Sequence, residues 1–515
     1  MVAAIGAAGK IKSGKVTEPE AMNQPETMAA IDLGSNSFHM IVVQQQNGQL
    51  QIIDRVKEMV RLGGGLDSKN NLTAEAMDRA IATLERFRQR LQDIPPHAIR
   101  CVGTKTLRTA RNAEAFMQRA QQALDHEIEI ISGFEEARLV YQGVTHAIES
   151  EDQPLLVMDI GGRSTELIRG VGQKPKQMES LTMGSVSMSL RHFADGKISR
   201  KRMERAELDA LAELRGIRKR YRQQPWSRAI GSSGTIRSIG RIIHASGWSH
   251  NAITFSDLKR LRKQLIEAGH IDALQLEGLK EERRPVFPGG LAILYATFKS
   301  LKIKEMLVSD GALREGVIYD SIGRISNHDI RELSVDALMD RYHVDSVHAE
   351  RVHVMASALF NQVADHFCDD ETRFENALRW AAKLHEIGLS ISHRKYHRHS
   401  AYLVQYSDIP GFSRQEQRTL GLLVGAHRMK LKQEPFEPFR LKDLLLQLTL
   451  LLRLSVLLYR GRGQEVIPVP QITLTEKKIS LQFEPEWLNE HALTQYDLKQ
   501  EQRYLKKAGI TLQYQ

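Results

Sequence analysis

The sequence has little cysteine and proline. The 15 Pro and 36 Gly exclude collagen and low-complexity classes for most of the length. The two cysteines, Cys101 and Cys368, are far apart and follow no metal-ligand spacing. This excludes a disulfide scaffold and a cysteine-rich zinc site, and it favours a reducing cytoplasm. The most lipid-like stretch, residues 441–459, carries Lys442 and Arg453, which a membrane span tolerates poorly. We therefore expect a buried helix there and no transmembrane segment, which leaves peripheral membrane association open.

What the chain does contain is enough apolar material for several cores. Hydrophobic residues make up 42% of the 515 residues, and at about 150 residues per domain the length predicts two to four domains. The 72 Lys and Arg exceed the 62 Asp and Glu, which gives a net charge of +10. This charge favours an anionic partner such as a nucleotide or polyphosphate. Nucleic acid is disfavoured because no recognition motif accompanies the charge.

The order of predicted elements divides the chain into four parts. Residues 1–27 are small, polar and basic and are expected to be a disordered leader. Residues 28–150 and 151–325 alternate strands with helices, which is typical of α/β domains with a mixed sheet. Within the first of these, Asn47-Gly48 predicts a hairpin turn. Residues 326–515 are mostly helical and end in two alternating runs, QITLTE and KISLQF, that predict a hairpin.

The sequence also predicts particular helices in residues 28–150 and in residues 326–515. Thr73 is the expected N-cap of a helix after it. In the C-terminal part, Val347, Met355, Leu359 and Val363 form a helical stripe that predicts a core face.

The most informative feature is an internal repeat of the two α/β parts. Ile31–Ser37 (IDLGSNS) matches Met158–Ser164 (MDIGGRS), and each copy is an apolar strand that ends in Asp before a small turn. Glycine-rich turns let backbone N–H groups approach phosphate oxygens, and an Asp at the strand end can hold hydrated magnesium. Two ordinary hairpin turns are the alternative for either copy alone. Two copies in matching contexts favour a phosphate cleft between related domains.

Two further glycine turns precede helices. Gly231–Thr235 (GSSGT) follows a strand and opens a helix, whose N-terminus can receive an anion. The phosphate-binding candidates in this turn are Ser233, Gly234 and Thr235. Ser309–Ala312 (SDGA) has the same arrangement, although either turn by itself is also compatible with a simple helix cap.

Charged residues near these turns are candidates for chemistry. Arg108 lies just past a predicted strand end, where a guanidinium can grip phosphate with two hydrogen bonds, whereas Arg111 is compatible with a solvated side chain. Glu135 and Glu136 open a helix, where carboxylates are ordinarily favourable to the helix dipole. One of them is expected instead to point into the cleft and orient a water.

These motifs together resemble a known family. AAIDLGSNSFHM, TKTLRTA, SGFEEARLVYQG, DIGGRSTEL, GSSGT and SDGALREG, in this order, are similar to the exopolyphosphatase and guanosine-pentaphosphate phosphohydrolase family. The resemblance covers nearly the whole chain from Met28. It implies an α/β fold class with two duplicated actin-like, sugar-kinase-like domains of the ribonuclease H-like type. An all-helical C-terminal region that resembles HD phosphohydrolases, with a small β end, would follow them.

The resemblance also implies roles for matching residues. Glu136 would be the catalytic base, Arg108 would bind the terminal phosphate, and Asp159 and Glu166 would assist catalysis. Magnesium, with manganese as the alternative, would be held by the carboxylates Asp32, Asp159 and Glu166. The residues that would cradle phosphate are Ser35, Asn36, Ser37, Gly161, Gly162 and Ser164.

Two positions leave alternatives open. Arg163 replaces the small residue of many family members, and it either narrows the cleft, adds a phosphate contact or points outward. His385-Glu386, followed by further histidines, is compatible with a metal site or with a structural role, and we expect the structural role. Nearby basic residues are then expected to extend a polyanion path. These residues, called here the Arg394 basic group, are Arg394, Lys395 and Arg398.

Three functions are compatible with these motifs. The leading hypothesis is an exopolyphosphatase that releases orthophosphate from the ends of polyphosphate. The alternative, in the same fold, is removal of the 5′ γ-phosphate of guanosine pentaphosphate to give the tetraphosphate. A non-catalytic polyphosphate or nucleotide sensor is the third, and the presence of Glu136 and Arg108 disfavours it. The resemblance also implies a homodimer.

Overall fold

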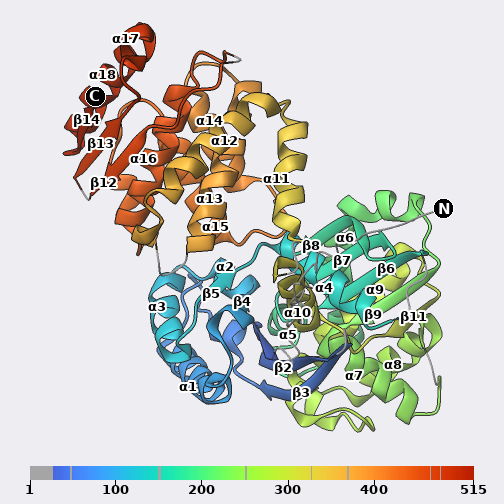
Figure 1. Ribbon diagram of the computed structural model, residues 1–515. Coiled ribbons are helices and arrows are strands. Elements are labelled where there is room, and N and C mark those ends of the chain that lie inside the picture. The colour runs from blue at the N-terminus through green and yellow to red at the C-terminus, as the bar shows by residue number, and fades with distance from the viewer. Residues whose placement is uncertain are drawn as a thin grey trace, which may run out of the picture.

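Figure 1 shows the computed structural model, in which two α/β units lie side by side and a helical region sits against them. The structure describes residues 27–46, 49–148, 152–249, 252–325, 328–367, 371–463, 465–475 and 477–515. The expected leader, apart from Thr27, and the expected Asn47-Gly48 turn lie outside the described residues.

The first sheet follows the predicted alternation of strands and helices. Among the described residues it has five strands in the order β3-β2-β1-β4-β5, in which β1, β2 and β3 are antiparallel and β4 and β5 are parallel to β1. Thr73 caps the first helix as expected, because its side chain accepts a hydrogen bond from the Ala76 N–H. The strands are β1 (Thr27–Leu33), β2 (Phe38–Gln46), β3 (Gln49–Glu58), β4 (Ile99–Gly103) and β5 (Ile128–Ile130). The helices are α1 (Ala74–Leu91), α2 (Lys105–Thr109), α3 (Ala113–Leu124) and α4 (Gly133–His146).

The second sheet repeats this topology. In the described part of the chain its order is β10-β11-β9-β6-β7-β8, with an antiparallel β6-β7-β8 meander and with β9 and β11 added in parallel. The strands are β6 (Pro154–Ile160), β7 (Thr165–Val171), β8 (Lys174–Leu181), β9 (Arg228–Ser232), β10 (Ile253–Thr254) and β11 (Glu305–Val308). The helices are α5 (Ser185–His192), α6 (Arg200–Gln223), α7 (Ser233–Ala245), α8 (Phe255–Ala268) and α9 (Phe287–Leu301). The duplicated actin-like architecture is therefore present.

One helix within residues 151–325, which the sequence assigned to the second α/β domain, packs on the first domain instead. Helix α10 (Leu313–Ile325) follows the second sheet in sequence but packs on α4 and β1 of the first unit. Gly143 of α4 and Gly316 of α10 allow this crossing, because a Cβ on Gly316 would lie 1.8 Å from the Leu139 carbonyl oxygen. The boundary between the two units therefore does not follow chain order at this helix, because the chain returns to the first core after completing the second.

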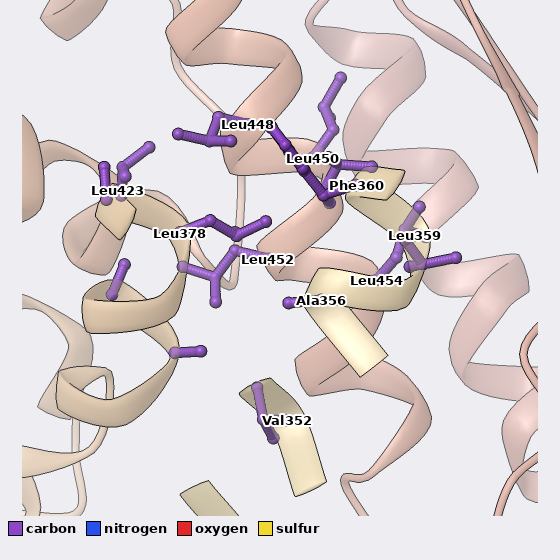
Figure 2. Close-up of a cluster of buried hydrophobic side chains, with 14 of the residues drawn as sticks. Val352, Ala356, Leu359, Phe360, Leu378, Leu423, Leu448, Leu450, Leu452 and Leu454 are labelled. Carbon is purple, nitrogen blue, oxygen red and sulfur yellow. The ribbon is translucent and has the colours of Figure 1, made fainter. Parts of the chain in front are cut away.

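The helical region forms its own core around α16, which is the apolar stretch that the sequence predicted to be a buried helix. Figure 2 shows leucines of α16 packed among side chains such as Phe360 and Leu378. The expected stripe is correct at Met355, Leu359 and Val363 but wrong at Val347, whose side chain is exposed. The helices are α11 (Ile330–Arg341), α12 (Ser346–Asn361), α13 (Glu371–Leu384), α14 (Tyr396–Tyr406), α15 (Arg414–Ala426), α16 (Lys442–Leu458), α17 (Trp487–Glu490) and α18 (Ala492–Lys507).

The small β end contains the predicted hairpin and one further strand. Strands β12 (Gln471–Leu474) and β13 (Lys478–Gln482) are antiparallel, and β14 (Thr511–Tyr514) adds to β13 in parallel. Among the described residues, none of the helices combines the length and the hydrophobicity that a membrane-spanning segment requires. Helix α16 instead buries Arg453, whose guanidinium donates to both carboxylate oxygens of Glu501.

The helical region touches the first unit at the edge of its sheet. The side chain of Gln415 bonds the backbone of Ile128 and Ile130 on β5, and Ser413 forms a β-bridge with Ile131. In Figure 1, α15 accordingly lies next to β5 and α2. The connection between α14 and α15 therefore ends beside the loop that leads into α4.

Candidate active site

The two repeated glycine turns face each other across a narrow cleft. A Cβ on Gly162 would lie 2.9 Å from the Cβ of Ser35 and 3.5 Å from the Asn36 nitrogen, so the turns are in direct contact. The cleft encloses about 100 Å³. The predicted residues that line it are Asp32, Ser35, Asn36, Ser37, Glu136, Asp159, Gly161, Gly162, Ser164, Ser233 and Gly234. The structure thus brings together most of the residues selected from the sequence.

Glu136 and Arg108 form an ion pair at this cleft. Ser132 caps α4 with its side-chain oxygen, which places Glu136 in the first turn of the helix. Arg108 Nη1 donates to Glu136 Oε2 at 2.8 Å and also to the Ile131 carbonyl at 2.8 Å. Arg108 lies in the short helix α2, which follows the end of β4. Its head group is held at two points beside the carboxylate.

The adjacent Glu135 has a different environment. Its side chain is fully buried, and both of its oxygens accept hydrogen bonds from Arg138, at 2.8 and 2.7 Å. One of these oxygens also accepts the Gly411 N–H from the helical region, at 2.8 Å. Glu135 therefore joins α4 to the helical region, and Glu136 is the glutamate that faces the cleft.

Several carboxyl groups converge at the strand ends. Asp159 and Glu166 are register partners on β6 and β7, so their side chains share one face of the sheet. Burial raises the pKa of Asp32 to about 7 and that of Asp159 to about 6, and the charge of Glu136 adds to both shifts. Burial also raises the pKa of Glu166 well above its usual range, followed by repulsion from Glu136. These carboxyl groups are therefore poorly solvated, and the charge of Glu136 further disfavours their ionised forms.

This donor set fits a hard divalent cation. Asp32 Oδ1 is buried without a hydrogen-bond partner, and all the candidate donors are oxygens. The described carboxylates of Asp32, Asp159 and Glu166 do not all approach within 4.8 Å of one another. Magnesium usually uses one or two carboxylates and completes its shell with water and substrate phosphate oxygens, so it needs no closed protein cage.

A hydrogen-bonded chain that the sequence did not predict ends at Ser37. Arg314 Nη1 approaches His39 Nδ1 at 2.5 Å, and His39 Nε2 lies 2.7 Å from Ser37 Oγ. Burial and then the Arg314 charge hold the pKa of His39 well below its usual range, so the ring is neutral. Arginine can only donate, so Nδ1 accepts, Nε2–H donates to Ser37, and the Ser37 hydroxyl hydrogen is free for a phosphate oxygen.

The third glycine turn contributes two of its three predicted residues. Ser233 and Gly234 open α7 and line the cleft, whereas Thr235 is buried and does not line it. A Cβ on Gly234 would lie 2.0 Å from Arg283 Nη2, so the missing side chain makes room for this guanidinium. The helix N-terminus and Arg283 together present positive potential to the cleft.

A larger cavity of about 800 Å³ adjoins the cleft and was not predicted from the sequence. Gly234, Arg237 and Arg283 line both spaces. The apolar side chains along the cavity are Ile148, Ile230, Ile253, Leu307 and Val308. Its basic side chains are Lys57, Arg228, Arg237, Arg241, Lys280 and Arg283, and they outnumber the two carboxylates in the wall, Glu282 and Asp310, which pair with Lys57 and Arg237. The cavity is therefore suited to a ligand with both an apolar ring and negative charge.

Arg163 does not point outward. Its Nη1 donates to the Gly63 carbonyl of the first unit at 3.0 Å, so the side chain crosses between the two units. A Cβ on Gly63 would lie 3.1 Å from Arg163 Cδ, which shows how closely the two segments approach.

The helical region contains a second polar cluster, apart from the cleft. His348, His385 and Glu386 are buried and offer ligand atoms within 4.8 Å of one another. Arg462 Nη2 already contacts both Glu386 oxygens at 2.6 Å, which compensates the carboxylate charge without a metal. The structural role expected for His385-Glu386 stays a prediction. The Arg394 basic group is exposed around the start of α14, outside the residues that line the cleft.

Fold and site together define the class of protein. Two duplicated actin-like units bring glycine turns, an arginine–glutamate pair and clustered carboxylates to one phosphate cleft. Residues 41–325 match the Ppx/GppA phosphatase family, and residues 330–502 match Ppx/GppA phosphatase, domain III. The chain belongs to the Ppx/GppA phosphatase family and is a hydrolase that acts on phosphoanhydride bonds.

The similarity to individual relatives extends over most of the chain. It is 42% identical over 483 residues to a guanosine-5′-triphosphate,3′-diphosphate pyrophosphatase of Vibrio cholerae serotype O1, covering 94% of this chain and 96% of the relative. A protein of the same name from Aeromonas hydrophila is 40% identical over 490 residues, covering 95% and 98%. Among solved structures, an exopolyphosphatase from Cytophaga hutchinsonii has 27% identity and a TM-score of 0.53, covering 57% of this chain and 97% of its own.

Proposed function

We propose that this protein is a guanosine-pentaphosphate 5′-phosphohydrolase, which converts the pentaphosphate to the tetraphosphate. The observation that supports this function is the 800 Å³ cavity next to the phosphate cleft, with its apolar and basic walls. An inorganic polyphosphate chain has no apolar part to place there, whereas a nucleoside with a 3′-diphosphate has both. The names of the relatives point the same way. The leading expectation from the sequence, an exopolyphosphatase, is therefore replaced by its alternative.

In this proposal the residues of the cleft act mainly by positioning. The glycine turns and the Ser37 hydroxyl hold the 5′-phosphates, and Arg108 binds the terminal phosphate. Glu136 accepts a proton from a water that attacks the terminal phosphorus in line with the bridging oxygen. The bond from phosphorus to the bridging oxygen breaks, and orthophosphate and the guanosine tetraphosphate leave. Magnesium at Asp32, Asp159 and Glu166 would neutralise phosphate charge.

The test compares phosphate release from guanosine pentaphosphate and from long polyphosphate at equal enzyme concentration. Ala252→Phe places a ring in the cavity, and Ala245→Phe, at an exposed position on α7 outside it, is the matched control. We expect Ala252→Phe to raise KM for the pentaphosphate at least about tenfold and to leave polyphosphate hydrolysis near wild type. Faster wild-type turnover of polyphosphate, with no effect of Ala252→Phe on the pentaphosphate, would return the assignment to an exopolyphosphatase.

The oligomeric state and the cellular compartment of the protein are also proposals. We propose a homodimer that works in the cytoplasm, on the basis of the family resemblance and of the two distant cysteines. Sedimentation velocity and cell fractionation test these two statements.

A further inference from the structure

A small cavity with basic side chains lies beside α2, the short helix that carries Arg108. It measures about 200 Å³. The polar residues that line it, from α2, the end of β8, α5 and the second glycine turn, are Lys105, Thr109, Arg163, Thr182, Ser187 and Arg191. It is called here the Lys105 pocket.

The position of this pocket follows from its neighbours. Lys105 precedes Arg108 by three residues on α2, which places both side chains on one side of that helix. Burial and then the Arg108 charge lower the pKa of Lys105, and the charges of Glu136 and Glu166 act in the opposite direction. Arg163 follows Gly162, which lines the phosphate cleft. The Lys105 pocket therefore lies near the Arg108–Glu136 pair and next to the second glycine turn of the phosphate cleft.

The two inner cations of the pocket have no carboxylate partner. Within the described residues, no Asp or Glu oxygen forms a salt bridge with Lys105 or Arg163. Lys105 Nζ donates only to Thr182 Oγ1, at 3.4 Å, and Arg163 donates to the Gly63 carbonyl. Both side chains are partly buried, and partly buried cations without a counter-charge are costly unless an anion joins them. Arg191, at the rim, is already paired with Asp209 at 3.2 Å.

We propose that the Lys105 pocket is a binding site for inorganic phosphate, the product released at Glu136. This rests on the proposed hydrolysis at the cleft. With the nucleoside in the large cavity, the terminal phosphate is the end that reaches the Arg108–Glu136 pair. Lys105, on the same helix as Arg108, and Arg163 offer the freed phosphate an ammonium and a planar guanidinium, which suit a tetrahedral oxyanion. Phosphate held there is an inhibitor of further turnover.

The experiment measures inhibition of substrate hydrolysis by added inorganic phosphate. Lys105→Met and Arg163→Gln remove one charge each, and Gln keeps a donor for the Gly63 carbonyl. Lys201→Met, at an exposed site on α6, is the matched control. We expect each pocket variant to raise the inhibition constant of phosphate roughly tenfold. Lys105→Arg should restore most of the inhibition, which a misfolded variant would not do.

The outcome is separable from the choice of substrate. If polyphosphate is the better substrate, the same inhibition series is run on polyphosphate. If no substrate is turned over, calorimetric titration of inorganic phosphate into the wild type and Lys105→Met measures the site directly. Inhibition constants or titrated affinities that are the same in Lys105→Met, Arg163→Gln and Lys201→Met overturn the proposal. So does an equal loss in Lys105→Arg and Lys105→Met.

Discussion

Two adjacent glutamates at the start of α4 should respond in opposite ways to the same substitution. In Glu136→Gln the amide oxygen can still accept from Arg108 Nη1, and Arg108 keeps its second bond to the Ile131 carbonyl. Substrate binding should therefore stay near wild type while the proton acceptor is lost. A general base contributes about 10²–10⁴ in rate, so kcat should fall by that factor. The barrier then rises by about 3–5 kcal/mol.

Glu135→Gln should instead reduce stability. Glu135 accepts two bonds from Arg138 and one from the Gly411 N–H, all at a fully buried site. Glutamine keeps one acceptor oxygen and turns an NH₂ group toward a guanidinium that cannot accept it. Breaking one member of a buried ion pair costs about 3–5 kcal/mol, and the remaining bond of Arg138 to Asp320 offsets part of this cost. We expect a loss of about 2–3 kcal/mol in the free energy of unfolding.

The assay measures steady-state phosphate release and urea unfolding for both variants. Glu136→Gln should unfold at the wild-type urea concentration and lose turnover, and Glu135→Gln should unfold earlier and keep turnover at low temperature. Glu136→Gln with more than about a tenth of wild-type kcat would refute its role as the base. Full stability of Glu135→Gln with lost turnover would show that the two glutamates have been assigned in reverse.

Three further predictions concern the charges around the site. Asp32 and Asp159 have pKa values of about 7 and about 6 in the folded protein, against 3.8 in the unfolded chain. The folded protein therefore binds more protons than the unfolded chain between these values, and its stability falls as pH rises from about 4 to 7. Magnesium binds the ionised carboxylates, so it should raise the Tm of the protein more at about pH 8 than at about pH 5. An equal rise in Tm at both pH values would contradict a magnesium site at these carboxylates. His39→Phe should raise KM about tenfold, because the Ser37 hydroxyl is no longer held in one direction. His39→Gln keeps a hydrogen-bonding group and should have a KM between that of His39→Phe and the wild type. Equal kinetics in the two variants would contradict this positioning role of His39. Neutralising the Arg394 basic group should weaken long-polyphosphate binding and flatten its salt dependence without changing guanosine-pentaphosphate hydrolysis. Binding at several salt concentrations and phosphate release from the pentaphosphate check these two statements.

Local patterns were sufficient to predict much of the fold. The repeat at Ile31–Ser37 and Met158–Ser164 predicted two related units, because a buried strand followed by a glycine turn is determined by near neighbours in sequence. Thr73 was identifiable as a cap for the same reason, and the apolar stretch 441–459 as a buried helix. The stripe that included Val347 was wrong at its first position, because periodicity does not tell where a helix first meets its partner.

Within the site, sequence determined which residue types were available, and tertiary structure decided which of them act together. Glu135 and Glu136 are equivalent in sequence, and only the docking of Gly411, 276 residues later, assigns one to the interface and leaves the other at the cleft. His39 and Arg314 meet although 275 residues separate them, because α10 returns to the first core after the second is complete. The large cavity and the Lys105 pocket likewise exist only between elements distant in sequence. Chain order encodes the local strand, turn and cap, whereas the direction and charge of each side chain in the cleft depend on long-range packing.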